Sequence, residues 1–185
     1  TPQRSEIKSR KEIDIGNTLD ENNGIHLTLP IISAPMDTVT GPVMARAMRS
    51  AGGLGIIHRY NSIAQQAEEA RSALNGADRL GAAVGASGDF EERACALYDV
   101  GVSILCVDVA HGHHVLVERA IKTLKDIFGN NIHIMAGNVA TASGFKALES
   151  WGADSIKVGI GGGSICSTRI QTGHGMPTLQ SVFDI

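Results

Sequence analysis

The sequence predicts an α/β fold in which parallel strands alternate with helices. Apolar, β-branched segments recur along the chain, and their starts lie about 22 to 29 residues apart. A helical periodicity of apolar residues fills the interval between successive segments. The segments are nearly continuous in apolar residues, which is typical of parallel strands that helices cover. We therefore expect a right-handed series of βα units.

Residues 1–29 form a polar lead-in to this series. Turn-forming residues occur at Gly16-Asn17 and at Asn22-Asn23-Gly24. Two short segments, residues 12–15 and 25–29, have the composition of extended strands. We expect them to form a small hairpin ahead of the first βα unit.

The βα series itself occupies residues 30–185. Strands are expected at residues 31–34, 54–57, 80–84, 104–109, 133–136 and 155–160, and helices at 42–50, 63–74, 90–100, 115–128 and 142–151. Pro42 suits the first turn of a helix, and Asp89 and Thr141 are suitable N-cap residues. Gly101 and Gly152 follow helix ends, where glycine accommodates a left-handed cap.

Polar residues after the strand ends decide between two architectures. An open doubly wound sheet concentrates its site at one switch point, whereas a barrel gathers one site from many strand ends. Asp37, His58, Asp108 and Asn138 follow four different strands, which favours a TIM-type (β/α)8 barrel. Because such a barrel needs about 250 residues and eight strands, we expect this chain to supply about six βα units, incomplete at the C-terminal side.

Composition excludes several functional classes. The net charge is −3 and aromatic residues make up 4%, so neither a nucleic-acid surface nor attraction to an acidic membrane is expected. No apolar run reaches the roughly 20 residues that cross a bilayer. Three cysteines without close spacing argue against a disulfide framework and for a reducing, cytoplasmic location.

The densest chemical signal lies in residues 157–178, which read KVGIGGGSICSTRIQTGHGMPT. Glycines let this backbone approach a ligand closely. Loop amides and Ser164 could bind a phosphate, and exposed carbonyls could bind a monovalent cation. Amide dipoles would lower the pKa of Cys166 and favour the nucleophilic thiolate. The alternative is a flexible surface loop with an incidental cysteine.

Other strand ends carry further candidates, each with a structural alternative. Met36 offers a polarizable surface for a flat ring. Asp37 either binds a ligand hydroxyl or caps the next helix. His58 is either a ligand contact or a polar cap, and Asn138 either orients a nucleotide or closes its turn.

Asp108 precedes a histidine-rich segment at residues 111–114. Because the histidine spacing matches no usual zinc pattern, a carboxylate that accepts hydrogen bonds from dinucleotide ribose hydroxyls is the better interpretation of Asp108. Cys95, in an amphipathic helix, and Cys106, in a strand, are predicted to be small core residues.

Five segments carry a family resemblance. They read SAPMDTVT, GGLGIIHR, DVAHGH, AGNVAT and KVGIGGGSICSTR, in this order along the chain. Together with the opening PQRSEIKSR, they resemble the family of inosine monophosphate dehydrogenases and guanosine monophosphate reductases over essentially the whole chain. The resemblance implies a TIM barrel that binds a purine nucleotide and NAD at its C-terminal face, in an enzyme that is commonly a homotetramer.

The resemblance also implies a covalent mechanism on Cys166. The thiolate would attack carbon 2 of inosine monophosphate, hydride would pass to NAD, and water would hydrolyse the thioimidate to xanthosine monophosphate, a step of guanine nucleotide biosynthesis. Thr168 would lie beside Cys166 in the active site. The other implied roles are substrate binding by Ser164, Met36 and Asn138, cofactor binding by Asp108, Gly159 and Gly161, and potassium binding by backbone carbonyls of Gly161, Gly163 and Cys166.

Two features depart from the family pattern. Gly162 stands where many members have proline. A short connection joins Ala73 to Leu80, where many dehydrogenases insert paired regulatory CBS modules, so no CBS domain is expected in this chain. The water-activating flap of dehydrogenases would follow Ile185, which leaves open whether this chain is active by itself.

We therefore expect an NAD-dependent inosine monophosphate dehydrogenase, because the APMD, GGLGIIH and AHGH segments resemble dehydrogenases more closely. An NADPH-dependent guanosine monophosphate reductase is the alternative, which the short connection favours. Hypotheses of other classes are a non-catalytic nucleotide-binding or assembly module, and a flavin- or sugar-phosphate-dependent barrel enzyme, since fold does not fix function.

Overall fold

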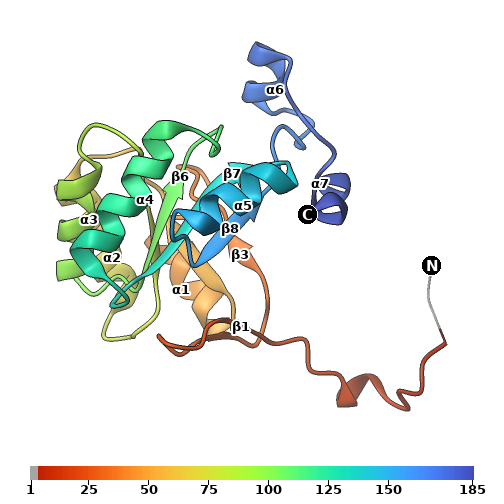
Figure 1. Ribbon diagram of the computed structural model, residues 1–185. Helices are drawn as coiled ribbons and strands as arrows, with labels where there is room; N and C mark the ends of the chain where they lie inside the picture. Colours follow the sequence, from red (N-terminus) through yellow and green to blue (C-terminus); the bar gives the residue numbers. More distant parts are fainter. Residues whose placement is uncertain (1–3) are drawn as a thin grey trace.

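The computed structural model describes residues 4–185, and its central element is a six-stranded parallel sheet that curls into part of a barrel (Figure 1). Each strand pairs with the next one in the sequence, in the order β3-β4-β5-β6-β7-β8. This order confirms the barrel, because a doubly wound sheet reverses its strand order at a switch point. The strands are β3 (Ile32–Ser33), β4 (Leu54–Ile57), β5 (Gly81–Val84), β6 (Ile104–Asp108), β7 (His133–Val139) and β8 (Ser155–Val158).

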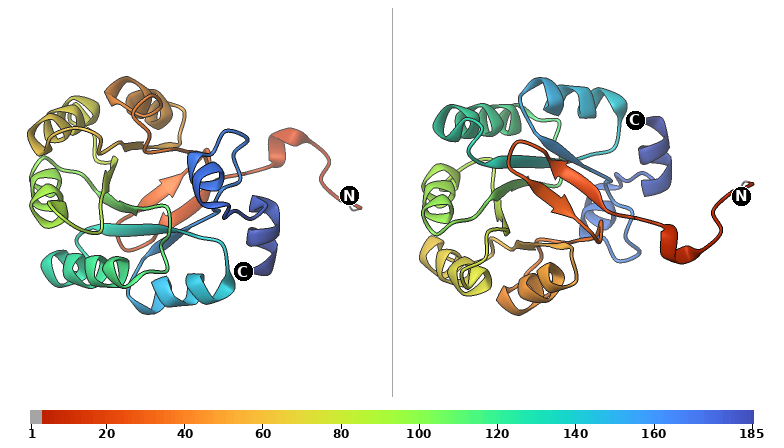
Figure 2. Two further views of the ribbon diagram at one scale, coloured as in Figure 1. Left: turned by 90° about the horizontal axis from the view of Figure 1, so that it is seen from above. Right: turned by 90° about the horizontal axis from the view of Figure 1, so that it is seen from below.

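Five helices follow successive strands and cover the outer face of the sheet (Figure 2). They are α1 (Pro42–Ser50), α2 (Ile63–Leu74), α3 (Phe90–Asp99), α4 (Val115–Phe128) and α5 (Ala142–Ser150). Two short helices beyond the expected ones, α6 (Ser167–Thr172) and α7 (Thr178–Asp184), come after β8. No helix within residues 4–185 is long and apolar enough to span a membrane.

The lead-in forms a hairpin, but its first strand is not the expected one. β1 (Asn17–Asp20) pairs antiparallel with β2 (Ile25–Leu27). The predicted strand at residues 12–15 is wrong, since a 3-10 turn (Arg10–Glu12) enters this segment. In addition, the Asp14 carboxylate accepts the Gly16 N–H at 2.8 Å and bends the chain.

This hairpin lies across the lower end of the barrel, at the N-terminal ends of the strands (Figure 2, right view). Ile25 and Leu27 are buried among the inward-facing apolar side chains of the strands. His133 at the start of β7 places Nδ1 2.8 Å from the Asp20 carboxylate and Nε2 2.8 Å from the Ser155 hydroxyl. These contacts tie the hairpin to β7 and β8.

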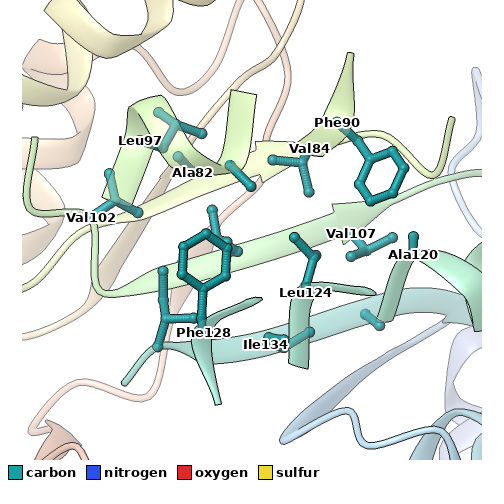
Figure 3. Packing of buried hydrophobic residues seen from close by; sticks show 14 of the residues in the cluster. Ala82, Val84, Phe90, Leu97, Val102, Val107, Ala120, Leu124, Phe128 and Ile134 are labelled. Carbon is teal, nitrogen blue, oxygen red and sulfur yellow. The ribbon is translucent and has the colours of Figure 1, made fainter. Parts of the chain in front are cut away.

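A second apolar cluster fills the layer between sheet and helices (Figure 3). Val84, Val107 and Ile134 point outward from neighbouring strands, and Leu97 of α3 and Leu124 of α4 pack against this layer. All five side chains are fully buried. Burial of one such side chain stabilises the fold by about 1.5–3 kcal/mol, so this layer holds the strands and helices together.

Most helix ends follow their sequence signals. Thr141 accepts a backbone N–H of the first turn of α5 at 3.2 Å, as predicted. Asp89 is the N-cap residue of α3, as predicted, but its carboxylate makes no capping hydrogen bond and instead pairs with Arg93 at 2.7 Å. Cys106 is buried as expected, but the core assignment of Cys95 is wrong, since this residue is exposed.

Candidate active site

A cavity of about 400 Å³ opens at the C-terminal ends of the strands. The C-terminal ends of β6 and β7 and the turns after β4, β6 and β8 contribute to it, so one site is gathered from several strand ends as the sequence predicts. The lining residues are Arg59, Tyr60, Asp108, Val109, Ala110, Asn138, Gly159, Ile160, Gly161, Cys166 and Thr168.

Cys166 is the nucleophile candidate of this cavity. It lies immediately before α6, in extended backbone conformation. The backbone N–H of Arg169, the backbone and hydroxyl of Thr168 and the Arg169 charge together lower the pKa of the Cys166 thiol below its ordinary value. The Arg169 side chain is held nearby, since it donates to the Ser164 carbonyl at 3.2 Å. This environment favours the thiolate.

Gly161 sets the path of the loop that carries Cys166. Its φ is +70°, and a Cβ there would lie 2.7 Å from the Gly175 Cα and 2.8 Å from the His174 carbonyl oxygen. The two stretches of chain therefore approach each other only because side chains are missing. A second tie follows, since the Met176 N–H donates to the Ile160 carbonyl at 2.9 Å.

Asp108 at the end of β6 forms an ion pair with Lys157 of β8. The strand register places Asp108 opposite Gly137 and Gly137 opposite Lys157, so the pair spans the intervening strand. Lys157 is absent from the predicted site residues. A signal for it exists in the sequence: Lys157 stands between Ile156 and Val158, which pack outward, so it belongs to the inward-facing row.

Asn138 lies at the cavity and also holds the neighbouring backbone in place. It lines the cavity, and its amide Nδ2 donates to the Gly159 carbonyl at 3.0 Å. Its own carbonyl accepts the Gly112 N–H at 2.7 Å. Asn138 therefore joins the end of β7 to the turns after β6 and β8 at the cavity.

Arg59 and Tyr60 also line the cavity, although neither is among the site residues predicted from the sequence. Arg59 donates from Nη2 to the Asp108 carbonyl at 3.3 Å, and its guanidinium lies 5.7 Å from the centre of the Tyr60 ring. His58 lies outside the lining and accepts the Tyr60 N–H at Nδ1, which agrees with the polar-cap interpretation. Arg59 and Tyr60 directly follow the C-terminal end of β4, and this position is the sequence signal that could have found them.

Several predicted residues do not line this cavity. Met36 is 52% exposed, and Gly163 and Ser164 are also exposed and lie outside the lining. Asp37 accepts a neighbouring backbone N–H at 3.0 Å. The alternative in which Asp37 caps α1 is wrong, because Gly41 is the N-cap of that helix.

A second cavity of about 600 Å³ adjoins the first and shares Ala110, Ile160 and Thr168 with it. Its remaining lining residues are His111, Ala140, Thr141, Thr172, His174, Gly175 and Met176. Thr168 therefore borders both spaces. Within residues 4–185, no group of three or more His, Cys, Asp or Glu side chains is arranged to hold a metal ion.

Comparison with known proteins identifies the family of this chain. The family model described as the IMP dehydrogenase / GMP reductase domain matches residues 1–185. The chain belongs to the IMP dehydrogenase / GMP reductase family. This assignment confirms the resemblance that the five sequence segments carry.

Relatives on both sides of the family match almost the whole chain. The crystal structure of inosine 5'-monophosphate dehydrogenase from Legionella pneumophila is 42% identical, with a TM-score of 0.89, over 99% of this chain and 55% of that chain. The dehydrogenase of Cryptosporidium parvum is 34% identical over 98% of this chain and 54% of its own length. GMP reductase 2 of Homo sapiens is 36% identical over 99% of this chain and 53% of its own length. The chain thus spans about half the length of these family members.

Proposed function

We propose that the protein oxidises inosine monophosphate to xanthosine monophosphate with NAD, through a covalent intermediate on Cys166. The observation that carries this proposal is the environment of the Cys166 thiol. Cys166 has a lowered pKa and lines a cavity together with Asp108 and Asn138, which come from two different strand ends. Family membership supports the proposal.

The Cys166 thiolate would add to carbon 2 of the purine, using its electron pair for the new S–C bond. Loss of hydride from that carbon then leaves a thioimidate. Bound NAD supplies the acceptor for this hydride. Water adds to the same carbon, the S–C bond breaks, and xanthosine monophosphate, a proton and the free thiolate result. Thr168 and the Arg169 N–H would stabilise the thiolate before addition and after release.

The two cavities suit the two ligands. Asn138 in the first cavity would orient the purine nucleotide. Asp108, which Lys157 holds in one orientation, would accept hydrogen bonds from a ribose of the dinucleotide. The nicotinamide end fits the second cavity, because Thr168 borders both spaces and would place that ring near Cys166.

We also propose a potassium site on the backbone carbonyls of Gly161, Gly163 and Cys166. Uncharged oxygens are suitable ligands for a hard cation. The Gly163 and Cys166 carbonyls already accept backbone N–H groups, but a carbonyl oxygen has a second lone pair. In an exchange of potassium for a large organic cation, turnover should fall while the affinity of the protein for inosine monophosphate, measured calorimetrically, persists.

The test of the main proposal is an assay of the full protein with inosine monophosphate and NAD, followed by NADH absorbance. Cys166→Ser should abolish the signal. Cys95→Ser is the matched control, since Cys95 is exposed on α3, and it should leave the rate unchanged. No Cys166-dependent signal would refute the proposal.

One observation favours a reductase as the second candidate. The alignment with human GMP reductase 2 is 187 residues long, whereas the alignment with the Cryptosporidium parvum dehydrogenase extends over 224 residues. The reductase thus aligns with fewer inserted residues than this dehydrogenase, which agrees with the short connection between α2 and β5. In that reaction the thiolate would add to carbon 2 of guanosine monophosphate, and the amino group would take up a proton from water and leave as ammonia. NADPH would supply hydride to carbon 2, and breaking of the S–C bond would give inosine monophosphate and the free thiolate. Oxidation of NADPH with guanosine monophosphate would identify it.

We further propose a cytoplasmic homotetramer. Three free cysteines fit a reducing compartment. Light scattering of the full protein would test the tetramer, and a monomer at working concentration would refute it.

A further inference from the structure

His58 and Glu69 form a polar pair behind the cavity that the proposed mechanism does not use. His58 follows β4 and its side chain is 12% exposed, while Glu69 belongs to α2. The His58 Nε2 lies 3.9 Å from the Glu69 Oε2. Within the described residues, that buried oxygen has no hydrogen-bond partner. Burying a carboxylate oxygen without a hydrogen-bond partner costs free energy. An orientation of the His58 ring that turns its Nε2 proton toward this oxygen is therefore favoured.

The other ring nitrogen of His58 fixes the local backbone. The Tyr60 N–H donates to Nδ1 at 3.2 Å. Because Nδ1 accepts, the neutral ring carries its proton on Nε2, which faces Glu69. The backbone N–H of His58 donates to the Thr40 carbonyl at 3.3 Å. His58 therefore connects the end of β4 to α2, to Tyr60 and to the segment before α1.

The turn that His58 fixes is the one that brings Arg59 and Tyr60 to the cavity. Arg59 lies between His58 and Tyr60 in the sequence, and its guanidinium donates to the Asp108 carbonyl. Among the residues that line the cavity in the described part of the chain, only Arg59 carries a positive charge. The His58 and Tyr60 rings also stack, with centroids 6.3 Å apart.

We propose that His58, oriented by Glu69, is a positioning residue that holds Arg59 and Tyr60 against the ligand beside Cys166. The identity of that ligand rests on the proposed function. The Glu69 carboxylate attracts the Nε2 proton across 3.9 Å, and the Nδ1 lone pair accepts the Tyr60 N–H. With the backbone of this turn held, the Arg59 side chain extends toward the cavity that it lines.

Two variants of His58 separate the acceptor from the ring. In His58→Asn the side-chain oxygen can accept the N–H two residues ahead, as asparagine does in Asx turns, whereas His58→Leu removes the acceptor. We expect His58→Leu to lower kcat/KM for inosine monophosphate about two- to tenfold through loss of one hydrogen bond, chiefly by raising KM. His58→Asn should stay within about twofold of wild type.

Glu69→Gln tests the orienting carboxylate, with Glu68→Gln as its matched control. Glu68 is 70% exposed and pairs with Arg71. Glu69→Gln should raise KM about twofold or more, because it removes the negative charge that attracts the Nε2 proton across 3.9 Å, and Glu68→Gln should leave KM unchanged. Equal effects of the two variants would overturn the role of Glu69.

Amide hydrogen exchange of Tyr60, read by NMR, tests the positioning role without any turnover. Exchange should be about two- to tenfold faster in His58→Leu and should return to the wild-type rate in His58→Asn. Exchange unchanged in His58→Leu, or equally fast in both variants, would overturn the proposal. Absent turnover in the wild type would refute the proposed function, while this exchange measurement would still decide the role of His58.

Thiol counting excludes a trivial loss of folding. Cys106 is buried and should stay unreactive in every variant, while the alkylation rate of Cys166 should remain at its wild-type value. A His58→Leu variant that exposes Cys106 would show a merely structural role and would overturn the proposal.

Discussion

Gly161→Ala is the sharpest test of how the loop presents Cys166. The new Cβ would lie 2.7 Å from the Gly175 Cα and 2.8 Å from the His174 oxygen, at a φ of +70°. The left-handed backbone costs a residue with a Cβ about 1–2 kcal/mol. The overlap with rigid backbone adds about 1–3 kcal/mol.

These contributions sum to about 2–5 kcal/mol, and each 1.4 kcal/mol corresponds to about a tenfold change in an equilibrium constant. The observed loop conformation should therefore become at least about 30-fold less favourable relative to displaced ones. The loop can move without unfolding the sheet, so the loss should appear in the site and not in global stability.

The assay is calorimetric binding of inosine monophosphate, together with alkylation of Cys166 at fixed pH. In Gly161→Ala both should weaken, and the melting temperature should change little. Gly163→Ala is the matched control in the same loop, because a Cβ there meets only ordinary contacts at 3.7 and 3.9 Å. Binding and alkylation in Gly161→Ala that match the control would refute this account of the loop.

Three further predictions concern the charged groups. Alkylation of Cys166 should accelerate with rising pH around a midpoint below the ordinary thiol pKa of about 8.5, and Thr168→Val should raise that midpoint; a wild-type midpoint at 8.5 or above would contradict the lowered Cys166 pKa. Burial alone would raise the pKa of Asp20, but hydrogen bonds from Asn23 and His133 outweigh it and lower the pKa to about 2. Because this pKa is depressed, the ionised carboxylate stabilises the folded state fully above the unfolded pKa of about 3.9, and this stabilisation disappears as the pH falls toward 2. In urea denaturation, Asp20→Asn should therefore lower the free energy of unfolding by about 2 kcal/mol at pH 7 and by much less near pH 2. An equal cost at both pH values would show that the linkage is absent. A double-mutant cycle of Lys157→Met and Asp108→Asn should yield a coupling free energy of about 1–2 kcal/mol in protein stability. This value lies between those of exposed and buried ion pairs, since both side chains are about a quarter exposed. Additive effects of the two substitutions on stability would show that the ion pair is energetically unimportant.

The sequence was sufficient for the barrel because each βα unit repeats the same local pattern. β4, α1, α2 and α4 begin and end where apolar periodicity predicts. β3 is shorter than residues 31–34, and β7 extends to Val139 instead of ending at 136, since pairing with neighbouring strands decides such ends. The hairpin could not be placed correctly, because one side-chain hydrogen bond from Asp14 outweighs extended propensity. α6 is too short to show periodicity.

The site was predictable where a single segment carries the chemistry, as around Cys166. It was not predictable where partners meet through strand register. Lys157 reaches Asp108 only because both lie opposite Gly137, and no local pattern contains that information. Ser164 illustrates the converse, since a suitable residue type in the right loop still points outside the cavity in this conformation.

The nucleophile and the strand-end groups are held by different kinds of structure. Asp108 and Asn138 stand on strands above a buried core, whereas Cys166 belongs to a loop tied down by the close approach of Gly161 and Gly175. β8 links the two, because it carries Lys157 and leads directly into that loop. A Cβ at Gly137 would lie 2.6 Å from the Lys157 Cβ and would push β8 outward, which would displace the ion pair and the loop together. The distance between thiol and strand-end groups is therefore set by backbone approach, which explains why so much glycine is concentrated at this end of the barrel.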